Sequence, residues 1–302
     1  MSIVILQQTL KLLLFLSCGF LLTRLRILPE QTPRCLSRLL LWLFSPALSL
    51  RSFAGFFTPE MLKTSSGLLL CGIVCTALSV LFALVIGRRF HTDHYTQDLC
   101  VYSIAIPNYG YVGYVLVLSV FGEEMFLKYQ ILTLPCALYI YTEGYRMLLG
   151  ETKRSFRNLL TPPMAAILLG ALLGLLRVPM PALADSVLSD LSACVGPCGM
   201  VLTGCVIAQF SFREILREKL LYVVTLLRMA VVPLLAYGLG RLLALPRELL
   251  LLVMCFLAMP TGVNTVVFPS TIGKDCHLGA GMALVSNPLA VLTIPLLLSL
   301  PM

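Results

Sequence analysis

The stretch IPNYGYVG, residues 106–113, interrupts an apolar segment that runs from about Leu99 to Phe121. A proline in such a segment removes a backbone donor and collides with the preceding helical turn. The glycines and the asparagine that follow allow the chain to leave helical geometry and to offer polar atoms. In lipid, backbone freed in this way is tolerated only where it is buried in protein or lines a cavity. The stretch therefore predicts a broken transmembrane helix.

A second stretch of the same kind, MPTGVNT at residues 259–265, interrupts the apolar segment from about Leu249 to Ile272. Its proline, Pro260, lies 153 residues after Pro107. Interrupted hydrophobic segments at matching positions of two halves point to the binding site of a secondary transporter. We therefore predict that both helices are broken and that they cross near the middle of the membrane.

The composition is that of a membrane protein. Of the 302 residues, 59% are hydrophobic and 12% are charged, with a mean hydropathy of +0.94. Soluble domains carry about 25% charged residues. Apolar runs long enough to span a bilayer, about 20 residues each, recur along the whole chain. We predict an all-α integral membrane protein with ten transmembrane helices, over residues 3–23, 35–56, 65–87, 98–121, 125–149, 159–177, 186–210, 216–240, 248–272 and 277–300.

The chain carries an internal repeat. Residues of the first half recur in the second at offsets of 151 or 153, as in the pairs Gly19–Gly170, Arg26–Arg177, Pro46–Pro197, Pro107–Pro260 and Pro135–Pro288. Each unit, 1–149 and 159–302, holds five predicted spans. Because five is odd, consecutive copies must face opposite ways across the membrane, which predicts two inverted five-helix repeats joined by the linker 150–158.

The basic residues predict the orientation of these helices. One set of alternate loops carries 13 lysines and arginines and the other carries six. The richer set is expected in the cytoplasm. The linker 150–158 is then cytoplasmic, and both termini are extracytoplasmic, in a multi-pass protein of the plasma membrane. The net charge of +8 follows from this topology and requires no nucleic-acid partner.

The two breaks supply the candidate substrate-binding residues. The amino-terminal ends of half-helices carry partial positive charge and free N–H groups, which suit a carboxylate. Asn108 and Asn264 add side-chain amides, and we expect the nearby tyrosines at 109, 111 and 114 to line a partly apolar pocket. The alternative is a pair of proline kinks that only serve helix packing. The candidates are Pro107, Asn108, Gly110, Pro260, Thr261 and Asn264.

Charged residues within the spans are few. Arg228 lies well inside the eighth predicted span, where a charge is costly and indicates a functional role. We consider it a charge partner, either of an anionic substrate or of a carboxylate side chain. No aspartate or glutamate lies in the middle of a span near either break. The sequence therefore leaves coupling to protons or sodium open.

The sequence gives little support for a metal site, a phosphate-binding loop or reactive cysteines. The stretch HTDH at residues 91–94 has no further histidine or cysteine nearby except Cys100, so we expect a solvated loop and no metal site. No phosphate-binding glycine loop with its lysine is present. The eleven cysteines lack CxxC spacing, and we interpret them as small packing residues. We expect no cofactor.

Several short motifs occur in a characteristic order along the chain. They are the run from Gly19 through Leu36 to Ser45-Pro46-Ala47, Asn-x-Gly-x-x-Gly at 108–113, and segments 197–208, 227–235, 258–260 and 293–296. Together they resemble the auxin efflux carrier (AEC) family, which includes bacterial malate- and malonate-type permeases and plant PIN carriers. The chain departs from the family pattern at Val115, where a proline is usual, and at Thr261, where plant members have glutamine.

The resemblance implies an NhaA-like fold. Helices 1, 2, 6 and 7 would form a scaffold and the surface of a homodimer, and helices 3–5 and 8–10 would form a transport domain whose helices 4 and 9 cross. Motion of one against the other would give elevator-type alternating access. Pro107, Asn108 and Pro260 carry over as residues of the crossover and the substrate site.

We therefore expect a secondary transporter for a small organic anion, most simply a carboxylate, without catalytic chemistry. Two alternatives remain at this point. One is a membrane-embedded sensor that binds a ligand without transport, and the other is a membrane-embedded enzyme, although no histidine lies within a span core. A cavity beside Asn108 would favour transport, whereas a dry, packed crossing would favour a structural role.

Overall fold

The computed structural model describes residues 2–90, 93–150, 161–211, 217–270, 274 and 276–302. All regular elements within these ranges are helices, which confirms the predicted all-α class. Most of the predicted linker 150–158 lies outside the described residues. Seven helical stretches of the described chain are long and apolar enough to cross a membrane. The count of ten spans stays a prediction, since α5, α14 and α15 are short and several helices join end to end.

The described part of the first half contains ten helical elements, in which η denotes a π-helical turn. They are α1 (Ser2–Arg24), α2 (Thr32–Leu39), η1 (Leu40–Phe44), α3 (Ser45–Phe56), α4 (Pro59–Gly87), α5 (His94–Ala105), η2 (Tyr109–Gly113), α6 (Tyr114–Tyr139), η3 (Ile140–Gly144) and α7 (Tyr145–Leu149). Within α6, Gly122 has a φ of 82° and breaks the helix. This break separates the predicted fourth and fifth spans.

The second half contains nine described elements. They are α8 (Pro162–Leu175), α9 (Ala182–Ala193), α10 (Val195–Ile207), α12 (Lys219–Leu226), η5 (Leu227–Val231), α13 (Val232–Leu242), α14 (Arg247–Leu257), α15 (Asn264–Ser270) and α16 (His277–Leu298).

Several helices begin at a side chain that caps them. The hydroxyl of Thr58 accepts from the Met61 amide at the start of α4, and Thr161 plays the same part at the start of α8. Asp93 caps α5 through its carboxylate. These side chains satisfy amides that have no partner inside the helix, so local sequence determines where these helices start.

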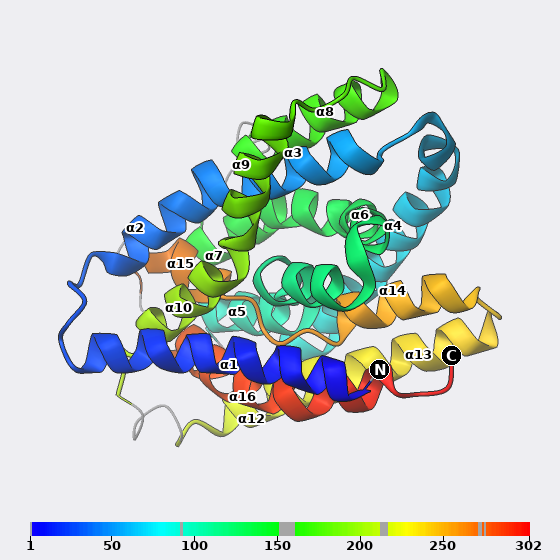
Figure 1. Cartoon of the computed structure of the whole chain (residues 1–302). Coiled ribbons are helices and arrows are strands. Elements are labelled where there is room, and N and C mark those ends of the chain that lie inside the picture. Colours follow the sequence, from blue (N-terminus) through cyan, green and yellow to red (C-terminus); the bar gives the residue numbers. More distant parts are fainter. Residues whose placement is uncertain (1, 91–92, 151–160, 212–216, 271–273, 275) are drawn as a thin grey trace.

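The helices run roughly side by side, and the N- and C-termini lie at the same end of the molecule (Figure 1). We call this the terminus end, and we call the opposite end, where α1 ends and α8 begins, the linker end. Positive charge in the loops predicts that the linker end is cytoplasmic. Large leucine side chains on the outside, such as Leu70, Leu168 and Leu242, are more than 60% exposed, as suits helices that face hydrocarbon.

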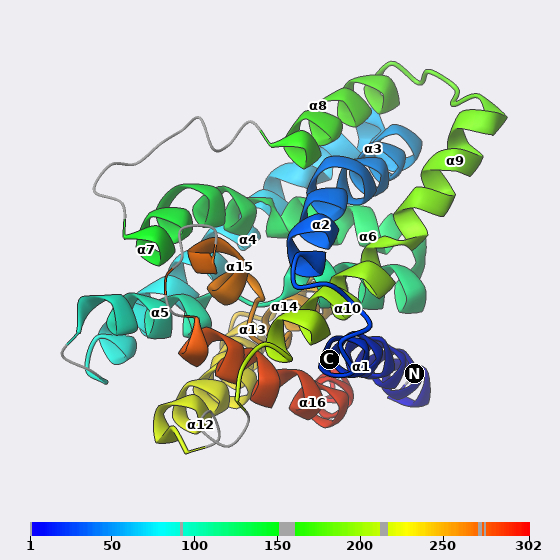
Figure 2. The ribbon, with the colours of Figure 1, turned by 90° about the vertical axis from the view of Figure 1, so that its left-hand side faces the viewer.

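Equivalent helices of the two halves each pack against the opposite half. Helix α1 packs against α10, and α8, the equivalent of α1 at the repeat offset of 151, packs against α3 (Figure 2). A methyl group at Gly19 would overlap the carbonyl oxygen of Val201, and one at Gly170 would lie 2.8 Å from that of Leu50. Both glycines and both partners are related by the offset of 151. Reciprocal contacts of this kind are what the predicted repeat requires, although the inversion itself stays a prediction.

The ends of α1 and α8 also match. Arg26 and Arg177, a pair found in the sequence repeat, both have left-handed backbone, with φ of 57° and 53°. In each case the following residue donates back to a carbonyl five residues earlier, from Ile27 to Leu22 and from Val178 to Leu173. The same turn therefore ends the first helix of each half.

Candidate functional site

Both predicted breaks are present, and they meet. Helix α5 ends at Ala105 and α14 ends at Leu257, and each chain continues in non-helical backbone before the next helix begins. The Asn108 amide donates to the Pro260 carbonyl oxygen at 2.7 Å. Pro107 and Thr261 form an isolated antiparallel bridge at the same point. The two interrupted segments therefore cross in direct backbone contact.

The carboxyl-terminal ends of α5 and α14 converge on one side chain. Arg228, in η5, is fully buried and donates through Nη1 to the carbonyl oxygens of Ile104 at 2.9 Å and Ala105 at 3.2 Å. Its Nη2 donates to the carbonyl oxygen of Leu257. Helix carboxyl ends carry unpaired carbonyls and partial negative charge, which a cation satisfies. A single guanidinium thus caps the carboxyl-terminal ends of both α5 and α14.

Two hydroxyl groups complete this closure. Ser79 of α4 donates to the carbonyl oxygen of Ala105 at 2.9 Å. Tyr129 of α6 donates to that of Cys255 at 3.3 Å. Carbonyls freed by a helix break are costly in an apolar interior unless they find donors, so these neighbours allow the breaks to persist.

The expected role of Arg228 as a charge partner stays a prediction. In the part of the chain that the structure describes, it has no carboxylate partner, and it is not among the residues that line the cavity described below. Its described hydrogen bonds all go to backbone carbonyls. We interpret Arg228 as a support of the crossover.

Asn108 lies at the start of the second half of its interrupted segment. Its Oδ1 accepts from the Tyr111 amide at 3.3 Å, and its carbonyl oxygen accepts from the amides of Val112 and Gly113. Its side-chain Nδ2 is buried and has no hydrogen-bond partner among the described residues. Asn108 therefore caps the helix with one side-chain atom and leaves a donor available with the other.

The second break is braced by its neighbours. Asn264, the first residue of α15, donates through Nδ2 to the hydroxyl of Tyr102 in α5 at 3.2 Å. The Thr261 amide donates to Ser286 Oγ of α16 at 3.2 Å. The first bond orients the Asn264 side-chain amide, and the second holds the backbone of the break against α16.

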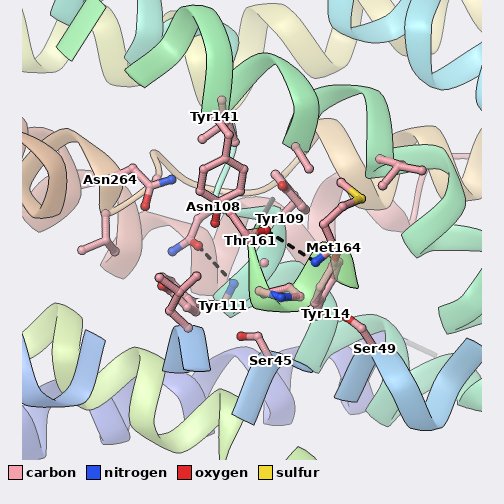
Figure 3. Close-up of a pocket in the computed structure, with 18 of the residues that line it drawn as sticks. Ser45, Ser49, Asn108, Tyr109, Tyr111, Tyr114, Tyr141, Thr161, Met164 and Asn264 are labelled. Atoms are coloured by element: carbon pink, nitrogen blue, oxygen red, sulfur yellow. Dashed lines mark hydrogen bonds between the residues drawn. The ribbon is translucent and has the colours of Figure 1, made fainter. Parts of the chain in front are cut away.

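A cavity of about 120 Å³ lies beside the crossover. Figure 3 shows Asn108, Asn264 and Tyr141 around it, with Ser45 and Ser49 of α3 on the facing side. The amino-terminal ends of η2 and α15 both border it, and none of the described residues that line it is charged. The lining residues are Leu41, Ser45, Ser49, Pro107, Asn108, Tyr109, Gly110, Tyr111, Tyr114, Leu134, Ala137, Ile140, Tyr141, Thr161, Pro163, Met164, Ile167, Gly262, Val263 and Asn264.

Four of the six candidates from the sequence line this cavity, namely Pro107, Asn108, Gly110 and Asn264. The tyrosines expected in a pocket also line it. Pro260 and Thr261 do not, because their polar backbone atoms are used within the crossover and with Ser286.

Sequence reasoning assigned no site role to the side chains contributed by other helices. Ser45 belongs to a motif that resembled the family, which is a signal that could have identified it. Ser49, Tyr141 and Thr161 carry no comparable signal, since they approach the crossover only through tertiary packing.

Ion pairs join helices at the terminus end. Arg51 of α3 binds Glu123 of α6 and, at 2.9 Å, Asp185 of α9. Arg177, just after α8, lies 3.1 Å from Glu60 of α4. The pairs of Arg51 with Glu123 and of Arg177 with Glu60 connect the predicted scaffold to the predicted transport domain.

No group of three or more histidine, cysteine, aspartate or glutamate side chains that could hold a metal occurs among the described residues. His91, part of the HTDH stretch, lies outside them. Near the end of the first half, Arg146 of α7 forms an ion pair with Glu143 of η3.

Comparison with known proteins adds one finding to this geometry. A protein-family model described as "Membrane transport protein" matches residues 4–155 and 151–298 of the chain. A search of curated proteins gave no match. The family match spans both predicted repeats and both breaks.

Proposed function

Because the chain belongs to the membrane transport protein family, which includes the auxin efflux carriers it was expected to resemble, we propose that it is a secondary transporter of a small organic carboxylate. The proposal places it in the plasma membrane, where a transport domain would move against a scaffold in elevator-type alternating access. A homodimer formed through the scaffold is part of this proposal.

The observation that carries the proposal is the cavity beside Asn108. The buried Nδ2 of that residue has no partner among the described residues, and an unpaired buried donor is costly unless a ligand or water binds it. The cavity, about 120 Å³, is smaller than the roughly 300–1,000 Å³ of drug-sized sites. Both features favour a substrate of few atoms that offers a hydrogen-bond acceptor.

The electrostatics favour an anion. The amino-terminal ends of η2 and α15 border the cavity, and the backbone amides of Gly110, Gly262 and Val263 donate to no backbone carbonyl of the described chain. Such ends attract negative charge. The partial negative charge of the opposite helix ends is offset by Arg228, which lies away from the cavity. A carboxylate could therefore bind without a charged side chain in direct contact.

The distribution of contacts favours a state that opens to the linker end. Ion pairs of Arg51 and Arg177 join the proposed scaffold and transport domain at the terminus end. Thr161 and Met164, in the first turn of α8 at the linker end, line the cavity. We infer an inward-facing conformation from this asymmetry.

The test is a thermal-stability screen of the purified protein against malonate, malate and other small carboxylates, with and without sodium, at two pH values. A ligand that binds the folded state raises the melting temperature with concentration. We expect a carboxylate to do so in the wild type and to need about tenfold higher concentration in Asn108→Ala. Stabilisation only by neutral or cationic compounds would remove the carboxylate from the proposal. Dependence on sodium or pH would identify the coupling ion.

Uptake separates the proposal from its alternatives. The carboxylate that stabilises the protein should accumulate in proteoliposomes that contain the protein, and Asn108→Ala should reduce the accumulation at low substrate concentration. Binding without uptake would favour a sensor, and chemical conversion of the ligand would favour an enzyme.

A further inference from the structure

A second cavity with basic residues lies at the linker end. Its volume is about 380 Å³. It is formed by the start of α2, the end of α10 and α15, and we call it the basic crevice. Its lining residues are Glu30, Pro33, Arg34, Ser37, Arg38, Leu202, Val206, Gln209, Phe210, Val266 and Val267.

Two arginines give the basic crevice its charge. Arg34 and Arg38 are four residues apart in α2 and therefore lie on the same helix face. Both are exposed, and neither forms an ion pair within the described chain. A third arginine, Arg24, donates to the carbonyl oxygen of Phe210 at 2.6 Å at the edge of the crevice. Glu30 offsets only part of this positive charge.

The basic crevice and the cavity beside Asn108 both lie along the contact between α10, in the proposed scaffold, and the crossover segments of the proposed transport domain. On α15, Asn264 lines the cavity, and Val266 and Val267 line the crevice. On α10, a methyl group at Gly199 would lie 2.9 Å from the ring of Tyr111, a cavity residue, and the crevice begins one turn later at Leu202. The crevice therefore neighbours the cavity along α10 and α15, on its linker-end side.

We propose that the basic crevice is a second anion-binding site, in which Arg34 and Arg38 hold the carboxylate of the substrate between the cytoplasm and the crossover. This rests on the proposed function, because it takes the substrate to be an anion. Arginines at a cytoplasmic membrane surface ordinarily serve to orient the protein in the membrane. Membrane orientation requires only that the loop is positively charged. It does not require a cavity, and it does not require that the arginines line a cavity between the proposed scaffold and the proposed transport domain.

The physical effect is local concentration of anions. Clefts lined by one sign of charge raise the local concentration of oppositely charged solutes. The effect falls with ionic strength, since the Debye length is about 8 Å at physiological salt. Guanidinium groups also bind carboxylates through paired hydrogen bonds. Arg34 and Arg38 would thus capture the substrate and release it to the uncharged cavity.

The test uses Ser37, which lines the basic crevice between the two arginines. Ser37→Cys is treated with an anionic sulfonatoethyl and a cationic trimethylammonioethyl methanethiosulfonate reagent, and labelling at residue 37 is followed by peptide mass spectrometry. The thiolate attacks the reagent sulfur and releases methanesulfinate, so the rate reports local reagent concentration. We expect the anionic reagent to react about three- to tenfold faster at low salt. Malonate at matched ionic strength should slow it.

Charge variants in the Ser37→Cys background show whether the anion is bound by Arg34 and Arg38 or is attracted by the overall positive charge of the surface. Arg34→Gln with Arg38→Gln should abolish the preference and remove the protection by malonate. Arg89→Gln, an exposed arginine after α4 that does not line the basic crevice, should leave both unchanged. Glu30→Gln should increase the preference. An unchanged preference in the double arginine variant, or no protection by malonate in the parent, would overturn the proposal.

Two further arms identify the bound anion and the site. Protection of the thiol in Ser37→Cys should survive the addition of Asn108→Ala if the crevice binds by itself, and its loss there would assign the anion to the cavity and overturn a second site. Asn108→Ala without effect on carboxylate uptake would instead contradict the proposed function alone. In phosphatidylcholine nanodiscs malonate should protect. Protection by added phosphatidylglycerol but not by malonate would mean that the arginines hold a lipid headgroup, which also overturns the proposal.

Discussion

Arg228 donates a 2.9 Å hydrogen bond to the carbonyl oxygen of Ile104, in the last turn of α5, across 124 residues of sequence. The same guanidinium donates to the end of α14 at Leu257. This relationship makes one side chain the joint between the two interrupted helices, and it gives the first prediction.

Arg228→Gln should destabilise the protein, because buried carbonyls at two helix ends lose their charged donor. We expect a loss of roughly 3 kcal/mol or more, seen as a lower melting temperature in detergent. Arg228→Lys keeps the charge but lacks the planar fork that reaches both helices, and it should restore only part of the stability. A Gln variant with normal stability and weakened carboxylate binding would instead place Arg228 in the substrate site.

Asn108→Ala should weaken carboxylate binding about tenfold, which corresponds to one hydrogen bond of about 1.4 kcal/mol. The lost helix cap costs about 1 kcal/mol of stability, so the protein should still fold. Asn108→Asp keeps a capping oxygen but replaces the free donor with a negative charge, and it should abolish binding of the anion. Titration calorimetry measures both, and equal affinity in wild type and Asn108→Asp would refute a direct contact.

Gly110→Ala and Gly113→Ala should separate binding from folding. A methyl group at Gly110 meets nothing within 4 Å and would occupy cavity space, whereas one at Gly113 would overlap the Tyr129 hydroxyl. The first should lower substrate affinity without loss of stability. The second should cost roughly 1–3 kcal/mol of stability, and Tyr129→Phe should recover part of it in a double-mutant cycle. Equal melting temperatures for the two alanine variants would contradict this packing.

Tyr102→Phe should loosen Asn264, because the hydroxyl that accepts from its Nδ2 is removed. We expect substrate affinity to fall severalfold and stability to fall by about 1 kcal/mol. Tyr139→Phe is the matched control, since the Tyr139 hydroxyl contacts Met147 Sδ and does not line the cavity. If the control weakens binding equally, the effect is not specific to Asn264.

Glu123→Gln should favour opening at the terminus end. Glu123 joins α6 to Arg51 of α3, whereas its neighbour Glu124 pairs with Lys128 in the same helix. Exposed ion pairs contribute about 0.2–1 kcal/mol, so the shift in population should be up to about fivefold. Labelling of Ser45→Cys by an impermeant thiol reagent from the terminus end should accelerate in Glu123→Gln and stay unchanged in Glu124→Gln. Equal rates in both variants would show that the pair does not restrain the motion.

The sequence predicted the breaks because their causes are local. Proline, glycine and asparagine act on the backbone where they stand, so Pro107 and Pro260 indicated both interruptions. The repeat in the sequence also pairs Gly19 with Gly170. The breaks and this pairing require no knowledge of tertiary contacts, whereas the packing of each glycine on the opposite half comes from the structure alone.

The partners of the breaks could not be predicted in the same way. A buried arginine such as Arg228 has the same local pattern whether it faces a ligand or a carbonyl, and only the fold brings Ile104 and Leu257 to it. Thr261 was a plausible ligand by its hydroxyl, yet its backbone pairs with Pro107. The facing wall, with Ser45 and Thr161, comes from helices that no pattern connects to the breaks.

The closure of α5 by Arg228 also bears on how the chain is made. Ribosomes deliver the first repeat to the membrane well before Arg228, which follows Ala105 by 123 residues. Until then the end of α5 lacks this donor, and an unsatisfied carbonyl in hydrocarbon costs several kcal/mol. We expect the nascent first half to remain in a loosely inserted form and to mature only when the second half arrives. If the two halves are expressed as separate polypeptides, each should be degraded when it is expressed alone, and both should persist when they are expressed together.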